Sequence, residues 1–235
     1  MKRPFLPVSL FLLLALAPVR NMQIALNDAD FQPADYASPI LQAEFQSSPE
    51  EVYNLYGANN GPARMVRTSA MRAAHRHDNW FVLVYGLFLL AFASIGYRLT
   101  REKYFLLLAV LTAAAAGADW LENSEISAIT RALDTETNQL GRLLQRLGWW
   151  TWLKWLGLAA YFGVLAQFFN PATAWGSLHP WAGLGLLWAC RIVPALAVIA
   201  ALTRQPVLIQ GMAHSITLMF GALFLFGLFY RKKRA

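Results

Sequence analysis

Long hydrophobic runs with few or no charges recur along the chain, and short polar segments separate them. About 20 consecutive apolar residues are enough for an α-helix to cross a bilayer. Tryptophans lie at or near the ends of several runs, as they do at membrane interfaces. Five runs occupy residues 80–97, 104–121, 149–169, 182–202 and 214–230, and a shorter one occupies 4–19. The pattern predicts an all-α protein, a polytopic transmembrane helical bundle of about six spans.

The same pattern divides the chain into three segments: an N-terminal transmembrane helix or signal anchor (1–19), an extracytoplasmic helical segment (20–79) and a five-helix transmembrane bundle (80–235). The first segment also resembles a signal peptide, because basic residues precede its apolar run and Ala15-Leu16-Ala17 offers small residues for cleavage. Pro18 directly follows that site, so we favour a retained helix, while cleavage stays open.

The 20–79 segment contains its own helix signals. Ser48-Pro49-Glu50-Glu51 is a predicted helix start, in which Ser48 caps, Pro49 takes the first helical position and Glu51 completes a capping box. A second helix is expected at about 63–74, and a short interfacial helix at 132–147 in a later polar loop. Two short helices cannot bury a large core alone, so we expect the segment to pack on the membrane portion or on lipid headgroups.

Composition supports a membrane location. Of the 235 residues, 57% are hydrophobic and 14% are charged, whereas about a quarter of an ordinary globular domain is charged. The net charge of +7 would suggest nucleic acid in a soluble protein. Here basic residues flank apolar helices, as membrane orientation requires, and no nucleic-acid partner is expected. The single cysteine, Cys190, excludes an intramolecular disulfide and cysteine-based metal motifs.

Charged side chains within or beside the apolar runs are the candidate functional residues. Asp119, Glu122 and Asn123 end one run, and their spacing puts them on one face of a helix. A carboxylate inside a membrane helix costs roughly 2.5–3.5 kcal/mol near the bilayer centre, so it usually faces a bundle interior and finds a partner. Lys154, a lone charge in the next apolar segment, is the candidate partner, and Asp78 lies just before another run.

Each of these residues also has a structural interpretation. Glu122 and Asn123 can simply mark the point where the helix leaves the membrane, and Lys154 can snorkel to the interface along its long stem. An Asp119–Lys154 pair that only holds two helices in register is as well supported by the sequence as a functional pair. These alternatives stay open.

Three further residues are possible accessory members of a site. Arg191 lies near the middle of its run, where an unpaired guanidinium is hard to tolerate. His77 and His214 are expected at the same interface as the acidic cluster. The spacing in His75-Arg76-His77 suits a metal site on a strand better than one on a helix, and no second ligand cluster matches, so neither a metal nor a cofactor is expected. The chain also lacks the common hydrolase and nucleotide-binding motifs.

Several of these residues fall within a longer series of motifs: Ile40-Leu41-Gln42-Ala43-Glu44-Phe45, Ser48-Pro49-Glu50-Glu51, Asp78-Asn79-Trp80-Phe81-Val82-Leu83-Val84-Tyr85-Gly86, Ala118-Asp119-Trp120-Leu121-Glu122-Asn123 and Lys154. The series, within about residues 38–165, resembles a family of small uncharacterised bacterial integral membrane proteins. In that family a D-x-x-F-x-x-x-Y motif opens one span, a D-x-x-E-N motif ends the next, and a lysine lies in the one after. Ala43-Glu44-Phe45 departs from the family's order at an "FEL"-like segment. The family has no established activity, so the resemblance supports the set Asp119, Glu122 and Lys154 but implies no reaction.

We therefore expect a multi-pass protein of the bacterial inner (cytoplasmic) membrane with both termini cytoplasmic, since basic residues cluster beside the segments on that side. Its site would comprise Asp78, Asp119, Glu122, Asn123 and Lys154 near the outer interface. The site would bind a lipid headgroup, through phosphate attracted by Lys154 and nearby arginines, or a small ligand or a partner membrane protein. A membrane-embedded enzyme acting on a lipid or isoprenoid, with Asp119 or Glu122 as general base, is the first alternative. A small ion-coupled transporter is the second.

Overall fold

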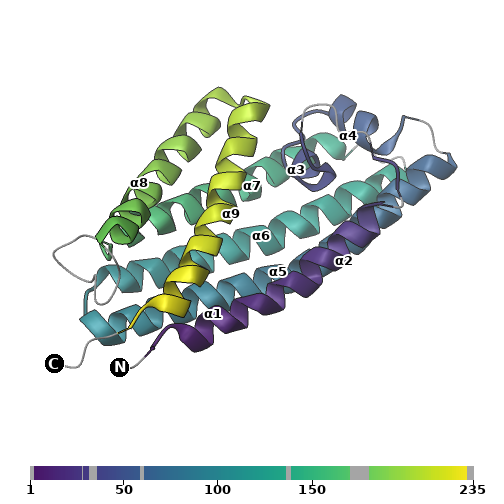
Figure 1. Cartoon of the computed structure of the whole chain (residues 1–235). Coiled ribbons are helices and arrows are strands. Elements are labelled where there is room, and N and C mark those ends of the chain that lie inside the picture. The colour runs from purple at the N-terminus through teal and green to yellow at the C-terminus, as the bar shows by residue number, and fades with distance from the viewer. Residues whose placement is uncertain are drawn as a thin grey trace. The chain divides into compact units, whose positions relative to one another are not determined.

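Helices account for all the regular secondary structure in the part of the chain that the structure, a computed structural model, describes. The described residues are 3–27, 29–31, 36–58, 61–135, 139–169 and 180–231. The elements are α1 (Leu6–Leu12), a 3-10 turn (Leu13–Ala15), α2 (Leu16–Asn27), α3 (Pro39–Glu44), α4 (Pro49–Tyr56), α5 (Pro62–Thr100), α6 (Tyr104–Thr135), α7 (Leu140–Leu165), α8 (Pro180–Thr203) and α9 (Pro206–Phe229) (Figure 1). The prediction of an all-α protein is confirmed.

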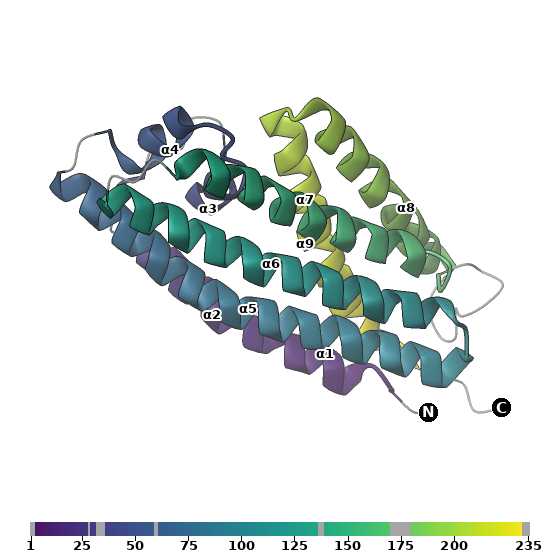
Figure 2. The same ribbon diagram turned by 180° about the vertical axis from the view of Figure 1, so that it is seen from behind.

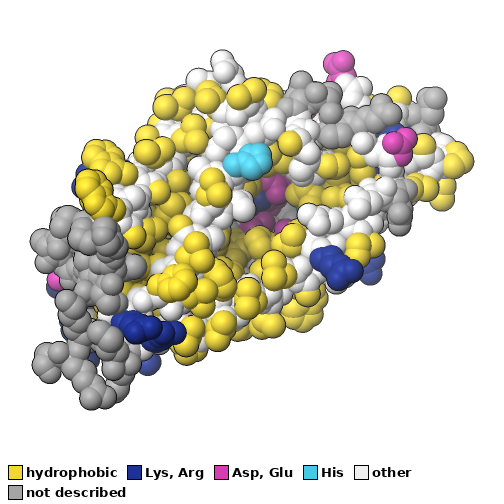
Figure 3. All heavy atoms as spheres, in the orientation of Figure 1, with side chains coloured by type: hydrophobic (Ala, Val, Ile, Leu, Met, Phe, Trp, Pro, Cys, Tyr) yellow, Lys and Arg dark blue, Asp and Glu magenta, His cyan; other side chains and the backbone are white. Residues whose placement is uncertain are grey.

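Five helical segments are long and apolar enough to cross a membrane: Leu6–Asn27, Pro62–Thr100, Tyr104–Leu133, Trp181–Thr203 and Pro206–Phe229. Between 22% and 44% of the most apolar window of each segment is buried, so most of these side chains face outward. Hydrophobic side chains accordingly cover much of the face drawn in Figure 3. The chain is a multi-pass membrane protein by this measure, and the expected polytopic bundle is confirmed.

Helix α7 is the remaining candidate for a span. Its 26 residues would extend about 39 Å, enough to cross a bilayer. It is not one of these five segments, because Lys154 and a group of tryptophans interrupt its aliphatic residues. A sixth span formed by α7 stays a prediction.

Several helices are longer than the hydrophobic pattern indicated. The expected helix at 63–74 and the run 80–97 are parts of one 39-residue helix, α5. The expected interfacial helix at 132–147 is wrong, because α6 continues to Thr135 and α7 begins at Leu140. Polar residues do not end a helix, whereas glycine and proline do so readily. No glycine or proline lies between Pro62 and Gly86, so nothing local interrupts α5.

The described residues pack into two compact units. Each of the long helices α5, α6 and α7 has residues in both units. The first unit comprises the described residues within 1–14, 84–115 and 155–235, and the second comprises those within 15–83 and 116–154. These units group residues that pack together. The three-segment division expected from the sequence concerns the side of the membrane on which each segment lies, and it stays a prediction.

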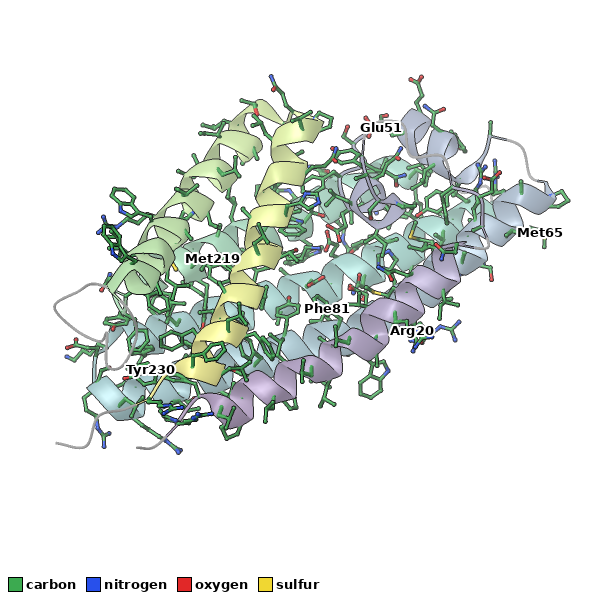
Figure 4. All side chains as sticks on the ribbon, in the orientation of Figure 1. Arg20, Glu51, Met65, Phe81, Met219 and Tyr230 are labelled. Atoms are coloured by element: carbon green, nitrogen blue, oxygen red, sulfur yellow. The ribbon has the colours of Figure 1, made fainter. Side chains whose placement is uncertain are left out.

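An aromatic core holds the first unit. The rings of Phe5 and Phe92 stack with centroids 4.5 Å apart, and Phe226 stacks on Tyr230 at 5.0 Å. Figure 4 labels Tyr230 at the end of α9. Helix α9 packs against both α1 and α8, and α8 and α9 lie side by side in both views (Figure 1, Figure 2). Aromatic rings bury large areas, so this core ties the N-terminal helix to the C-terminal one.

In the second unit, the short helices α3 and α4 begin with side-chain caps. Ser38 accepts a hydrogen bond from the backbone N–H of Leu41, and Ser48 accepts one from the backbone N–H of Glu51 (labelled in Figure 4). The Glu51 carboxylate also accepts from the backbone N–H of Ser47, at 2.7 Å. The predicted helix start at Ser48 is therefore confirmed, although Glu51 reaches one residue further back than an ordinary capping box.

Helix α4 ends at Gly57, whose φ of 107° disfavours any side chain. Arg64 donates to the backbone oxygens of Gly57 and Leu133, at 2.9 and 3.3 Å. This guanidinium ties the end of α4 to α6. Beneath it, residues of α4 pack with α6 and α7 in a hydrophobic cluster that includes Val52, Leu55, Ile129, Leu133 and Leu144.

Close packing of α1 on α9 depends on Gly227. A methyl group at this position would lie 1.9 Å from Ser9 Oγ and 3.2 Å from Phe5 Cβ. At Gly221, on the same helix, a methyl group would meet nothing within 4 Å.

We expect Gly227→Ala to lower the free energy of unfolding by roughly 1–3 kcal/mol, because overpacking forces neighbouring atoms to shift. Gly221→Ala is the matched control, and it should be neutral or stabilising by up to about 1 kcal/mol, since alanine favours a helix more than glycine does. Unfolding in mixed detergent micelles, followed by circular dichroism, measures both variants. Equal stability of the two variants would contradict the close α1–α9 contact.

Candidate functional site: a buried carboxylate–lysine cluster

The ammonium group of Lys154 lies among three carboxylates within the second unit. Its Nζ atom is 2.9 Å from Glu44 Oε1 and 3.5 Å from Asp119 Oδ1, and it donates a hydrogen bond to Glu122 Oε2. All four side chains are buried, with at most 6% of any of these residues exposed. We call Glu44, Asp119, Glu122 and Lys154 the carboxylate–lysine cluster. It confirms the expected contact of Lys154 with the acidic face of α6.

Helix geometry explains how the cluster is assembled. Asp119 and Glu122 are three residues apart on α6, and Thr151 and Lys154 are three residues apart on α7, so each pair shares one face. The Thr151 hydroxyl lies within hydrogen-bonding distance of Glu122 Oε1 and 3.0 Å from the backbone oxygen of Glu44. Glu44, the last residue of α3, is therefore held by two residues of α7: Lys154 contacts its side chain, and Thr151 contacts its backbone.

Asn123 forms a second group of hydrogen bonds beside the cluster. Its Nδ2 donates to Asp78 Oδ2 at 2.7 Å and to Asn79 Oδ1 at 3.1 Å. Because Nδ2 faces two acceptors, Oδ1 is the acceptor that faces His75 Nδ1, 2.7 Å away. We call His75, Asn123 and Asp78 the Asn123 bridge. The predicted residues Asp78 and Asn123 thus contact each other, through a bond that the sequence did not indicate.

The bridge assigns the tautomer of His75. Since Asn123 Oδ1 can only accept, the neutral imidazole carries its hydrogen on Nδ1 and a lone pair on Nε2. His75 is 1% exposed, and its Nε2 has no hydrogen-bond partner among the described residues. A buried acceptor without a donor costs folding free energy. His75 Nε2 therefore needs a hydrogen-bond donor, and no described residue supplies one.

Carboxylates outnumber cations in this region. The charged groups that act on Asp78 and Glu122 are Lys154, which attracts both, and the acidic side chains of Glu44 and Asp119, which repel both. If both were ionised, Asp78 and Glu122 alone would carry one negative charge more than Lys154 can balance. Burying uncompensated charge is strongly unfavourable. A proton on one of the carboxylates, or another positive charge in the site, would remove this cost.

The contacts described above involve none of the three accessory residues. Arg191 and His214 belong to the first unit, where Arg191 stacks over Trp188 and His214 Nδ1 lies 2.7 Å from the backbone oxygen of Gln210. His77 is partly buried on α5. A role for these residues in the site stays a prediction. Among the described residues, no group of three or more His, Cys, Asp or Glu side chains is placed to hold a metal ion.

Sequence reasoning missed Glu44, Thr151 and His75 as site residues. Glu44 had a signal, since it lies in the segment Ile40-Leu41-Gln42-Ala43-Glu44-Phe45 that contributed to the family resemblance. His75 precedes Asp78 by three residues, which places both on one helical face, but it was considered only as a metal ligand. Thr151 had no signal, because an isolated threonine is ordinary at any helix position.

The fold and the site define a multi-pass, all-helical membrane protein with a buried carboxylate–lysine cluster. No protein-family model, curated protein or solved structure matches the chain in the comparisons made. The resemblance to small uncharacterised bacterial membrane proteins therefore stays a proposal.

Removing the ammonium should destabilise the protein strongly. We expect Lys154→Met to lower the free energy of unfolding by roughly 3–5 kcal/mol, because it leaves buried carboxylates without their cation. Arg146→Met is the matched control, since Arg146 also lies on α7 and pairs with a carboxylate of α6, Glu125, at 2.6 Å. Its side chain is 58% exposed and only one buried carboxylate, Glu125, loses its cation, so this loss should be smaller, about 1–3 kcal/mol.

Detergent unfolding measures both variants and also the combination Lys154→Met with Glu122→Gln. The double variant removes both partners, so its loss should fall short of the sum of the single losses by about 0.5–3 kcal/mol. Strict additivity, or equal losses for Lys154→Met and Arg146→Met, would contradict the buried ion pair.

Proposed function

We propose that the chain is a non-enzymatic, multi-pass protein of the bacterial cytoplasmic membrane, with both termini in the cytoplasm, that binds a cationic ligand. Its ligand site would be the carboxylate–lysine cluster together with the Asn123 bridge, here called the buried polar site. The observation that carries the proposal is the excess of buried carboxylates over cations around Lys154.

The charge balance favours a cationic ligand over an anionic one. Phosphate recognition needs an ammonium or guanidinium with donors to spare. The ammonium of Lys154 is instead surrounded by Glu44, Asp119 and Glu122. A phosphate placed here would meet three carboxylates, so the expected attraction of Lys154 for phosphate gains no support from this geometry.

The lone pair on His75 Nε2, which has no hydrogen-bond donor among the described residues, further restricts the chemistry of the ligand. It needs a hydrogen-bond donor, and the neighbouring carboxylates accept hydrogen bonds as well. His75 also lies within electrostatic range of Lys154, so both parts of the buried polar site act on one region. A primary ammonium supplies a positive charge and three donors together. We therefore assign the ligand as a primary ammonium group.

Two sources share this chemistry: the ethanolamine headgroup of a phospholipid and a free primary amine in solution. On the face drawn in Figure 3, a few acidic side chains are visible among mostly hydrophobic ones. That setting is compatible with a ligand that arrives from the lipid. Protons compete with the ammonium for the same carboxylates, so ligand binding should release protons and strengthen as the pH rises.

The thermal stability of the full-length protein in phosphatidylcholine nanodiscs tests the proposal. A ligand at 100 times its dissociation constant adds about 2.7 kcal/mol of stability. We expect phosphatidylethanolamine in the disc, or free ethanolamine added to it, to raise the midpoint of unfolding, more at about pH 8 than at about pH 6. Choline should not do so, because its quaternary ammonium has no N–H donor. An effect of the lipid alone identifies the headgroup, and an effect of both identifies any accessible primary amine.

Asp78→Asn should abolish the effect, since it removes one carboxylate and keeps an acceptor for Asn123. Glu125→Gln is the matched control, because Glu125 is a buried carboxylate on α6 that pairs with Arg146 outside the site. It should respond to ethanolamine like the unmodified protein. Stabilisation by acid alone, with no response to either amine, would overturn the ligand and leave a site that binds only protons.

A further inference from the structure

A guanidinium lies at mid-depth in one of the most apolar helices, far from the buried polar site in the sequence. The candidate span on α8 runs from Trp181 to Thr203. Arg191 is ten residues from its start and twelve from its end, or about 15 and 18 Å along the axis. The hydrocarbon core is about 30 Å thick, so this residue is attached near the bilayer centre. Snorkelling is open to basic side chains near helix ends, and Arg191 is not near one.

The guanidinium faces outward on an apolar surface. Arg191 is exposed, and its Cζ lies 5.5 Å from the ring centroid of Trp188, one turn earlier. Ile192, Ala195 and Ile199 are exposed on the same side of the helix. We call these five residues the α8 face. Among the described residues, the only contact recorded for the Arg191 side chain is with this ring. The ring face attracts the cation but accepts no hydrogen bond in the plane of the guanidinium, where its five N–H donors lie.

We infer that the α8 face docks a transmembrane helix of another membrane protein, and that this helix carries an Asp or Glu at mid-membrane depth. A carboxylate matches the guanidinium in charge and accepts two parallel hydrogen bonds from it. Ala195, one turn beyond Arg191, leaves room for a second backbone to approach. Trp188 and the two isoleucines supply the apolar contact around the ion pair.

A second copy of this chain does not supply the carboxylate. The acidic residues in its candidate spans are Asp78, Asp119, Glu122 and Glu125. All four are buried and already engaged: Asp78 by Asn123, Asp119 and Glu122 by Lys154, and Glu125 by Arg146. The partner is therefore a different protein, recognised by an acidic side chain within its own membrane helix.

A designed helix tests this inference directly. The full chain, labelled through a terminal tag, is reconstituted in phosphatidylcholine vesicles with a fluorescent, lysine-flanked polyleucine peptide that has one central Asp. Energy transfer reports association. We expect this peptide to bind about tenfold more tightly than the matched peptide with a central Leu. Arg191→Gln should abolish the difference, and Arg191→Lys, which keeps the charge, should retain part of it.

Arg98→Gln is the matched control, because Arg98 is also exposed but lies in the last turn of α5. It should leave the preference for the Asp peptide unchanged. Equal binding of the Asp and Leu peptides would overturn the inference, as would a preference that survives Arg191→Gln. Subunit counting by photobleaching, without peptide, tests whether a second copy of the chain occupies the α8 face. Self-association that depends on Arg191 would show that it does, and would overturn the inference.

Discussion

The burial of one ammonium group constrains the second unit more than any other interaction. A lysine with 4% of its surface exposed needs counter-charges within contact distance, since the interior does not solvate it. Lys154 obtains them from two helices, α3 and α6, while Thr151 adds a hydrogen bond one turn earlier. The six-residue helix α3 is too short to be stable alone. Its position is therefore set by this ammonium as much as by its apolar contacts.

Stability alone does not account for the composition of the buried polar site. A buried ion pair is often no more stable than well-packed hydrophobic residues of similar volume. Here the carboxylates also exceed the cations, and His75 presents a lone pair without a donor. Each of these features costs folding free energy. A site that binds positive charge with N–H donors removes both costs at once, which is why we attribute the arrangement to ligand binding.

The two units carry opposite electrostatic problems. In the second unit, negative charge is buried in excess around Lys154. In the first, the positive charge of Arg191 lies exposed on an apolar helix near the bilayer centre. A membrane makes both arrangements expensive, because hydrocarbon offers neither counter-ions nor hydrogen bonds. We propose that a cationic ligand balances the negative charge buried in the second unit. We propose that a partner helix balances Arg191 in the first unit, so the two proposals rest on separate residues.

The sequence by itself determined the helical class, the apolar segments and the acidic face that meets Lys154, since these follow from local periodicity and from the cost of charge in an apolar run. It also indicated the starts of short helices, because caps are local. Only the tertiary structure decided that Glu44 and Thr151, 107 residues apart, share the ammonium's surroundings. It also decided that α5 runs unbroken through its polar stretch and that His75 joins Asp78 through Asn123. Contacts between distant residues depend on how helices pack, and a pattern read along one helix contains no information about its neighbours.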